Sequence, residues 1–296
     1  MARRRKPAVT HGLCVVDKPA GVTSHDVVGM LRKRFDERQV GHAGTLDPDA
    51  TGVLVVAVGM TTKLLRFIEK TTKRYEGEVV LGTETTTLDS SGEVTATHAM
   101  GEVTVETAQA VVDQHLTGDI EQIPPMVSAV KIDGKRLHEL AREGKEVDRP
   151  PRPVTIHEFT VTGRPEPGVL SIAVTCSAGT YIRTLAADLG RLLEGGAHLR
   201  NLRRTAVGEF TIDEAAGPDE CELLPVETAV RSLRAVPADD GLAALVANGR
   251  VLPRPAGMGD GPWAVFGPGG RLIAVYEAFG ADEAKPSVVL PTASGG

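Results

Sequence analysis

The stretch GVLVVAVG at residues 52–59, a run of mostly β-branched residues between two glycines, strongly constrains how this chain can fold. Valine favours extended backbone, and a short continuous apolar run is typical of a strand that is buried on both faces. The loop GHAGTLDPDATG, residues 41–52, leads directly into this strand. Because the expected strand is rigid, we expect it to hold the carboxylates of the loop in place.

Short strands and helices alternate irregularly along the rest of the chain. GLCVV and VLSIAVTCSAG predict strands, and the polar–apolar alternation of RYEGEVVLG predicts a half-buried one. Helical spacing of apolar residues predicts helices in HDVVGMLRKRF, TKLLRFIEK, TVETAQAVVDQHL and TYIRTLAADLGRLL. No Rossmann glycine pattern is present. The order of elements predicts an α+β fold around a mixed, largely antiparallel central sheet.

The 296 residues suggest two domains. We expect a larger domain at residues 1–238 and a small β-rich domain at 239–296. A basic segment framed by prolines, about residues 123–153, interrupts the larger domain and predicts an RNA-contacting insertion, although a plain surface excursion has the same signature. The small domain is marginal in isolation and is expected to pack on the larger one.

Charge is unevenly distributed along the chain. The net charge is −6, and residues 205–240 alone carry −7, so the remainder is slightly positive. Local potential rather than net charge attracts phosphates. Basic clusters that could contact nucleic acid, or equally be solvated faces, are Arg3–Lys6, then Lys63, Arg66, Lys70, Lys73 and Arg74, then Lys131, Lys135, Arg136, His138, Arg142 and Lys145, and finally Arg200, Arg203 and Arg204.

Several classes of protein are disfavoured by what the sequence lacks. No run approaches the roughly 18 apolar residues of a membrane span, and the N-terminus does not have the long apolar core of a signal peptide. The cysteines, Cys14, Cys176 and Cys221, lie far apart without C-x-x-C spacing, so neither disulfides nor a cysteine zinc site are expected. We therefore expect a cytoplasmic protein.

The loop at residues 41–52 has three interpretations from its residues alone. A calcium-binding EF-hand is excluded, because Thr51 replaces the third acidic ligand and Val58 the final glutamate. Asp47, Asp49 and Thr51 match the D-x-D-x-T of a phosphotransferase, but that motif should end a hydrophobic strand, and this one precedes it. A simple turn rich in Gly, Asp and Pro is the third interpretation.

The same loop resembles the catalytic motif of TruB-type tRNA pseudouridine synthases, in which the aspartate after G-T-L is the nucleophile. Further passages match this family in order. These are DKPAGVTSHDVV (17–28), KRYEGEVVLGTETTTLDSSG (73–92), CSAGTYIRTLAADLG (176–190) and GAHLRNLRRTAVGEF (196–210), and IPPMVSAVKIDGKRLHELAREG (123–144) resembles the family's insertion. The resemblance covers roughly residues 12–212, and the C-terminal module is more weakly similar to a PUA-like domain.

The resemblance implies that uridine 55 in the T loop of tRNA is isomerised to pseudouridine after the base is flipped out of the folded RNA. It implies no cofactor, no metal and no obligatory protein partner, and a monomer that binds the T stem-loop. The N-glycosidic bond is cleaved, the uracil rotates, and the ribose is rejoined through carbon 5. A carboxylate can start this reaction at carbon 1′ of the ribose or at carbon 6 of the base, and both alternatives stay open.

Residues carried over from the family motifs define a candidate site. Asp47, with an ordinary aspartate pKa, would be an ionised nucleophile at neutral pH. Arg183 would bind Asp47 bidentately and keep it charged. Tyr75 would stack on the uracil and take the proton from carbon 5. His42, Tyr181 and Leu202 would line the substrate pocket. Candidate RNA contacts or supporting residues are Lys18, Lys63, Asp89, Lys131 and Arg204.

A binding protein is the rival hypothesis. The basic clusters and the C-terminal module would also suit an RNA-binding or tRNA-folding protein that acts without catalysis. The presence of Asp47, Tyr75 and Arg183 together argues against binding alone.

Overall fold

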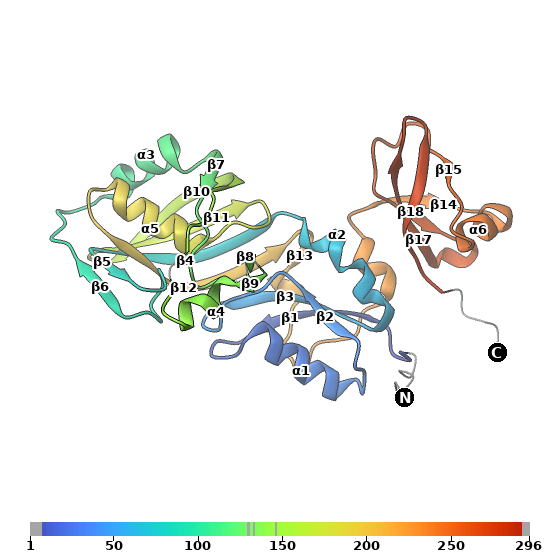
Figure 1. The fold of residues 1–296 in the computed structure, drawn as a ribbon, viewed down its shortest axis with the longest axis horizontal. Coiled ribbons are helices and arrows are strands. Elements are labelled where there is room, and N and C mark those ends of the chain that lie inside the picture. The colour runs from blue at the N-terminus through green and yellow to red at the C-terminus, as the bar shows by residue number, and fades with distance from the viewer. Residues whose placement is uncertain (1–7, 129–130, 133, 146, 292–296) are drawn as a thin grey trace.

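The computed structural model describes residues 8–291 apart from residues 129–130, 133 and 146. A nine-stranded sheet forms the centre of the larger part (Figure 1). Its neighbours are antiparallel except for one parallel pair, β3 with β12, so the prediction of a mixed, largely antiparallel sheet is confirmed. The strands in spatial order are β1 (Gly12–Lys18), β3 (Thr51–Val58), β12 (Ala197–Val207), β4 (Lys73–Leu81), β11 (Val169–Cys176), β10 (Arg152–Glu166) and β7 (Gly118–Gln122), while β2 (Val40–Ala43) pairs with β3 and β13 (Phe210–Thr211) with β12.

Strand β3 is buried on both faces, as its β-branched run predicts. Its side chains alternate between two separate apolar clusters: Val53 and Val55 pack with one, and Leu54 and Val56 with the other. A third cluster lies where α3 and α5 pack on strands β4, β10, β11 and β12. The loop that enters β3 is therefore attached to one of the most constrained strands of the molecule.

The helices of the larger part lie against this sheet and along its edges (Figure 1). Thr23 caps the first helix through a capping box that includes Asp26, so the helix predicted over HDVVGMLRKRF begins one residue earlier, at Ser24. The helices are α1 (Ser24–Arg34), α2 (Leu65–Glu69), α3 (Val105–His115), α4 (Leu137–Arg142) and α5 (Ile182–Leu192), with 3₁₀ turns η1 (Gly59–Leu64), η2 (Ile212–Glu214) and η3 (Val226–Val230).

The helix predicted over TKLLRFIEK is shorter than expected. Only Leu65–Glu69 is α-helical, because the preceding residues form the 3₁₀ turn η1. The Thr62 hydroxyl donates to the carbonyl of Gly59, a local bond that competes with a regular helical turn. Two small hairpins complete this part: β5 (Thr83–Thr85) with β6 (Val94–Thr97), and β8 (Lys131–Ile132) with β9 (Lys135–Arg136), the latter inside the expected insertion.

A second, five-stranded sheet and α6 (Asp240–Ala247) form the C-terminal part, which is β-rich, as the sequence predicts. Its first strand begins at Arg234, so residues before 239 already belong to this sheet. Leu272 and Val275 pack in one cluster with Phe67 and Ala229 of the larger part. The strands in spatial order are β14 (Arg234–Pro237), β16 (Trp263–Phe266), β17 (Leu272–Phe279), β18 (Glu283–Val289) and β15 (Leu252–Pro253), and a 3₁₀ turn, η4, covers Pro268–Gly270.

Within the part of the chain that the structure describes, no helix combines the length and apolar character needed to cross a membrane.

Candidate active site

The loop between β2 and β3 carries Asp47, and the Lys18 side chain binds the backbone of this loop. The Lys18 side chain is fully buried, and its Nζ donates to the carbonyl oxygens of Pro19, Val22 and Pro48 at 2.8, 2.7 and 2.8 Å. Burial lowers the pKa of Lys18, and the nearby carboxylates of Asp49 and Asp47 oppose this effect. Of the two roles expected for Lys18, the geometry matches structural support rather than phosphate contact.

Ser24 and Arg204 fix the same loop from two other sides. The Ser24 hydroxyl accepts from the backbone nitrogen of Leu46 at 2.9 Å and donates to its carbonyl at 3.1 Å. Arg204 is only 1% exposed, and its Nε and Nη2 donate to the carbonyls of Val53 at 2.7 Å and Gly44 at 3.0 Å. Buried guanidinium donors directed at backbone carbonyls make Arg204 a supporting residue.

Asp47 and Arg183 form an ion pair with two contacts. Nε of Arg183 lies 3.0 Å from Oδ2 of Asp47, and Nη2 donates to Oδ1 at 3.2 Å, the side-by-side arrangement that the resemblance implies. The Arg183 side chain is 5% exposed and that of Asp47 is 40% exposed. The arginine is thus embedded in the protein, whereas one side of the carboxylate remains open to solvent or substrate.

Asp89 supports Arg183 from behind. Its Oδ2 lies 3.4 Å from Nη1 of Arg183, which also donates to the carbonyl of Thr87 at 2.8 Å. Its Oδ1 accepts from the Thr87 hydroxyl at 2.6 Å and from the Ser91 hydroxyl at 2.5 Å. With its carboxylate anchored this way, Asp89 is placed to pair with Arg183.

The acidity of Asp47 differs from the sequence expectation. Burial raises the pKa of Asp47 above its ordinary value, and the Arg183 guanidinium lowers it by less than burial raises it. The neighbouring Asp89 carboxylate adds to the upward shift. The assumption of an ordinary aspartate pKa is therefore wrong, because it ignored the desolvation that comes with a partly enclosed site.

A cavity of about 170 Å³ opens beside the Asp47–Arg183 pair. Leu202 reaches it through a β-bulge: Arg200 pairs with Glu78 and Arg203 with Glu76, so Asn201 and Leu202 together face a single residue of β4. Asn201 adopts a φ of 53° at this bulge. The lining residues are Asp47, Pro48, Asp49, Ala50, Asp89, Ser90, Ser91, Arg183, Leu199, Arg200, Asn201 and Leu202.

The Glu78 carboxylate stabilises the bulge. Its Oε2 accepts from Nε of Arg200 at 2.7 Å and from Nδ2 of Asn201 at 2.8 Å. Arg203 in turn pairs with Asp17 at 2.8 Å. Arg200 and Arg203 are half-buried in ion pairs and Arg204 is buried against backbone carbonyls, so all three arginines of the fourth basic cluster have protein partners.

Tyr75 lies close to the site but does not line the cavity. It is half-buried on β4, directly opposite Arg204 of β12. Burial raises the pKa of Tyr75, and the Arg204 guanidinium opposes that rise. Tyr181 is also half-buried and lies at the start of α5, two residues before Arg183, where its backbone is bound by the Gln122 side chain.

His42 lies on β2, two residues before Gly44 of the loop that carries Asp47, the catalytic loop. His42 is outside the cavity lining. Burial lowers the pKa of His42, and the Arg204 and His25 charges add to this effect. Its buried Nδ1 has no hydrogen-bond partner within the described part of the chain. Lys63 is exposed on η1 and does not line the cavity. Lys131 begins β8, and its side chain lies outside the described part of the structure.

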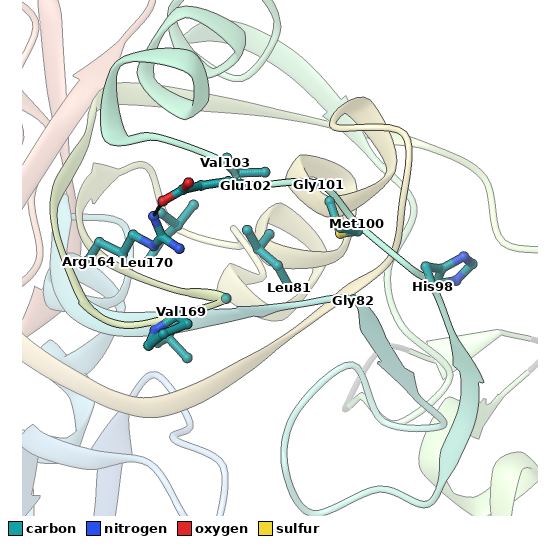
Figure 2. Close-up of a pocket in the computed structure, with 12 residues that line it drawn as sticks. Leu81, Gly82, His98, Met100, Gly101, Glu102, Val103, Arg164, Val169 and Leu170 are labelled. Atoms are coloured by element: carbon teal, nitrogen blue, oxygen red, sulfur yellow. Dashed lines mark hydrogen bonds and ion pairs between the residues drawn. The ribbon is translucent and has the colours of Figure 1, made fainter.

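A second cavity, of about 280 Å³, is bounded by the β10–β11 turn and the segment that follows β6 (Figure 2). The Arg164 guanidinium points across it to the Glu102 carboxylate, at 2.5 Å. Leu81 and Met100 also line this cavity. None of the site residues expected from the sequence lines this cavity, whereas Asp47, Asp89, Arg183 and Leu202 line the smaller one.

Four supporting residues were not foreseen from the sequence: Ser24, Glu78, Gln122 and Asn201. Ser24, Glu78 and Asn201 lie inside passages that resemble the family motifs, but a serine at a helix start and a glutamate or an asparagine in a strand give no local signal of a supporting role. Across the residues that can be described, no group of three His, Cys, Asp or Glu side chains is arranged to hold a metal ion.

Comparison with known proteins identifies similar chains along the whole length. Family models described as TruB family pseudouridylate synthase (N terminal domain), tRNA pseudouridylate synthase B C-terminal domain and tRNA Pseudouridine synthase II, C terminal match residues 32–182, 183–222 and 234–291. The tRNA pseudouridine synthase B of Rhodococcus jostii (strain RHA1) is 45% identical, covering 98% of this chain and 99% of that protein. The tRNA pseudouridine synthase B of Shouchella clausii (strain KSM-K16) is 43% identical, with coverage of 90% and 93%.

Solved structures share the fold. A chain in a Cbf5-Nop10-Gar1 complex is 26% identical with a TM-score of 0.72, covering 95% of this chain and 84% of that one. A chain in an H/ACA RNP bound to a substrate RNA containing 2′-deoxyuridine is 24% identical with a TM-score of 0.70, covering 95% and 85%.

Proposed function

Because the chain belongs to the TruB family of tRNA pseudouridine synthases, and is therefore an isomerase that acts on tRNA, we propose that it converts uridine 55 of the T stem-loop to pseudouridine. The observation that carries this proposal is the bidentate pair of Asp47 with Arg183 beside an open cavity. A carboxylate held at a fixed angle, with one side exposed, is suited to attack a flipped nucleotide.

In the proposed reaction Asp47 is the nucleophile. If its carboxylate attacks carbon 1′ of the ribose, it displaces nitrogen 1 of the uracil, and carbon 5 displaces the carboxylate from carbon 1′ after the base rotates. If it attacks carbon 6 of the uracil, the bond between nitrogen 1 and carbon 1′ breaks, carbon 5 bonds to carbon 1′ after the base rotates, and the carboxylate is then eliminated from carbon 6. Arg183 orients the carboxylate through one hydrogen bond and a second ion-pair contact, and it stabilises the charged form of Asp47, which the raised pKa of Asp47 makes necessary. The proton on carbon 5 leaves in the final step.

Four residues are assigned to contacts with the uridine after it is flipped out of the folded RNA. We assign Leu202, which is presented by the β12 bulge, to packing against the flipped uracil. Tyr75 is assigned to stacking and to removal of the carbon-5 proton, and its position opposite Arg204 is consistent with a role at the edge of the site. His42 and Tyr181 are assigned to contacts with the nucleotide. Neither residue lines the cavity of the free protein, so these contacts would form only when RNA is bound.

The remaining assignments follow from burial and exposure. Lys18, Asp89 and Arg204 act as supports of the catalytic loop and of Arg183, whereas the exposed Lys63 is assigned to RNA phosphates. Lys131 is assigned to RNA phosphates from its place in the basic insertion alone. We propose a two-domain monomer that works in the cytoplasm without a protein partner. The domain boundary is proposed just before Arg234, slightly earlier than the sequence indicates, because β14 pairs with β16 of the second sheet.

The experiment is tritium release from tRNA transcripts labelled at carbon 5 of uridine, followed by mapping of pseudouridine in the product. The wild-type protein should release tritium at position 55 and leave other uridines unmodified, and Asp47→Asn should release none. Activity retained in Asp47→Asn would refute the nucleophile assignment, and modification elsewhere would refute the position. Asp47→Asn also tests the rival tRNA-folding role, because any assisted refolding by that variant is independent of catalysis.

A further inference from the structure

Gln122, the last residue of β7, binds the backbone that leads into the helix of Arg183. Its side chain is buried, with 2% of the residue exposed. The side-chain oxygen accepts from the backbone nitrogen of Tyr181 at 3.0 Å, and the side-chain nitrogen donates to the Tyr181 carbonyl at 3.3 Å. One carboxamide thus binds both backbone polar groups of a residue that lies 59 positions further along the chain.

Tyr181 is the residue at which α5 begins, and its own side chain does not cap the helix. The two other helices of the same length begin differently: the hydroxyls of Thr23 and Thr104 accept from backbone nitrogens in the first turns of α1 and α3. Helix α5 lacks this local device. Gln122 therefore fixes its start from a neighbouring strand.

The segment that begins at Gln122 also contacts the guanidinium of Arg183. The carbonyl of Val127 accepts from Nη2 at 2.9 Å, and the same nitrogen donates to Oδ1 of Asp47 at 3.2 Å. Residues 122–127 accordingly contact the backbone two residues before Arg183 and the tip of its side chain. The position of the arginine depends on this segment at both ends.

We infer that Gln122 is a positioning residue for the Asp47–Arg183 pair, a role that rests on the proposed function of that pair. Its described hydrogen bonds go to Tyr181 rather than to Asp47, so it acts through the start of α5. Without the carboxamide, α5 is free to shift against β7, and a misplacement of about 1 Å can lower a catalytic rate on the order of 100-fold.

The chain contains a matched control in Gln109 of α3. Its side-chain oxygen accepts from the backbone nitrogen of Val161 at 2.7 Å, and its side-chain nitrogen donates to the carbonyl of Phe159 at 3.0 Å. This is the same kind of carboxamide-to-backbone contact, with one further bond from the side-chain nitrogen to the Asp113 carboxylate at 2.8 Å. It joins α3 to β10 and includes no residue of the cavity lining. Methionine is similar in length to glutamine and removes the hydrogen bonds, so Gln122→Met and Gln109→Met are comparable changes.

The test measures kcat, KM, the pH dependence of kcat and the thermal midpoint for both variants on a labelled T stem-loop RNA. Gln122→Met should lower kcat about 10- to 100-fold with KM within about twofold. The acid limb of its pH profile, where kcat falls as the pH decreases, should move to higher pH. The reason is that a displaced Arg183 no longer lowers the pKa of Asp47. Gln109→Met should lower the thermal midpoint by a similar amount and leave kcat within about twofold of wild type.

A kcat for Gln122→Met equal to that of Gln109→Met would overturn the inference, and so would a lower kcat with an unmoved acid limb. If Gln122→Met does not fold, Gln122→Asn replaces it, since asparagine keeps the carboxamide on a shorter stem. That variant should have an intermediate kcat, and a wild-type kcat would overturn the inference. An inactive wild-type protein would overturn the proposed function together with the inference, whereas an active wild type with an insensitive Gln122 would overturn the inference alone.

Discussion

Replacing Arg183 with methionine removes the cation of the site while keeping an unbranched side chain of similar reach. Arg183 contacts Asp47 through two nitrogens, of which Nη2 donates a hydrogen bond, and it also pairs with Asp89 and donates to the carbonyls of Thr87 and Val127. Breaking a buried ion pair by removing one partner costs about 3–5 kcal/mol. Since the Asp47 side chain is 40% exposed, solvent relieves part of this cost, and we expect a loss of about 2–3 kcal/mol in the free energy of unfolding.

This loss should be measured as a decrease in the thermal midpoint of about 4–10 °C at neutral pH. The decrease should depend on pH with a definite sign. The pKa of Asp47 is already raised in the folded protein, so the protonated form is favoured there, and this contribution to stability is lost as the pH rises through the folded pKa. Without Arg183 the pKa rises further. The difference between wild type and variant should therefore shrink as the pH falls and Asp47 becomes protonated.

Activity provides the second readout. In the wild-type protein kcat should fall as the pH decreases through the raised pKa of Asp47, at a higher pH than an exposed aspartate would give. In Arg183→Met, kcat should drop on the order of 100-fold or more and this acid limb should move upward. Arg183→Lys should have an intermediate kcat, because lysine keeps the charge but cannot contact both oxygens of Asp47 as the guanidinium does.

The control for this experiment lies on the same helix. Arg191 is 75% exposed and pairs with Asp188 at 2.7 Å, so Arg191→Met should change the free energy of unfolding by no more than about 0.5 kcal/mol and leave kcat unaltered. An Arg183→Met protein whose thermal midpoint differs from wild type by the same amount at about pH 5 and at about pH 8 would refute the electrostatic argument. So would an unmoved acid limb.

Three further substitutions test the supports of the site. Lys18→Met leaves three backbone carbonyls without their donor and should lower the free energy of unfolding by about 3 kcal/mol in urea titrations, so unchanged stability would contradict the role of Lys18. Ser24→Ala frees the backbone of Leu46 and should lower kcat on the order of 10-fold with unchanged KM; a change in KM alone would contradict it. Glu78→Gln weakens the β12 bulge and should raise KM for the T stem-loop severalfold through displacement of Leu202, whereas an unaltered KM would exclude that contribution.

Local patterns in the sequence determined much of the fold. The glycine-bounded run of β-branched residues became β3, buried on both faces, because continuous hydrophobicity over such a length has few other folded solutions. Thr23 started α1 through its capping box, and the irregular succession of short strands produced a mixed sheet. The ordered motifs also indicated the family and brought Asp47 and Arg183 into one proposed site before any geometry was known.

Tertiary structure alone decided the environments of individual side chains. Arg203 and Arg204 are adjacent in the chain, yet Arg204 is buried against the catalytic loop and Arg203 pairs with Asp17. The raised pKa of Asp47 and the Gln122 contact with Tyr181 were likewise not readable from local patterns. The physical reason is that desolvation and hydrogen-bond partnership depend on neighbours in space, which lie 136 positions apart for Asp47 and Arg183 and 59 for Gln122 and Tyr181. Periodicity reports only which face of an element is buried, and it carries no information about which groups meet there.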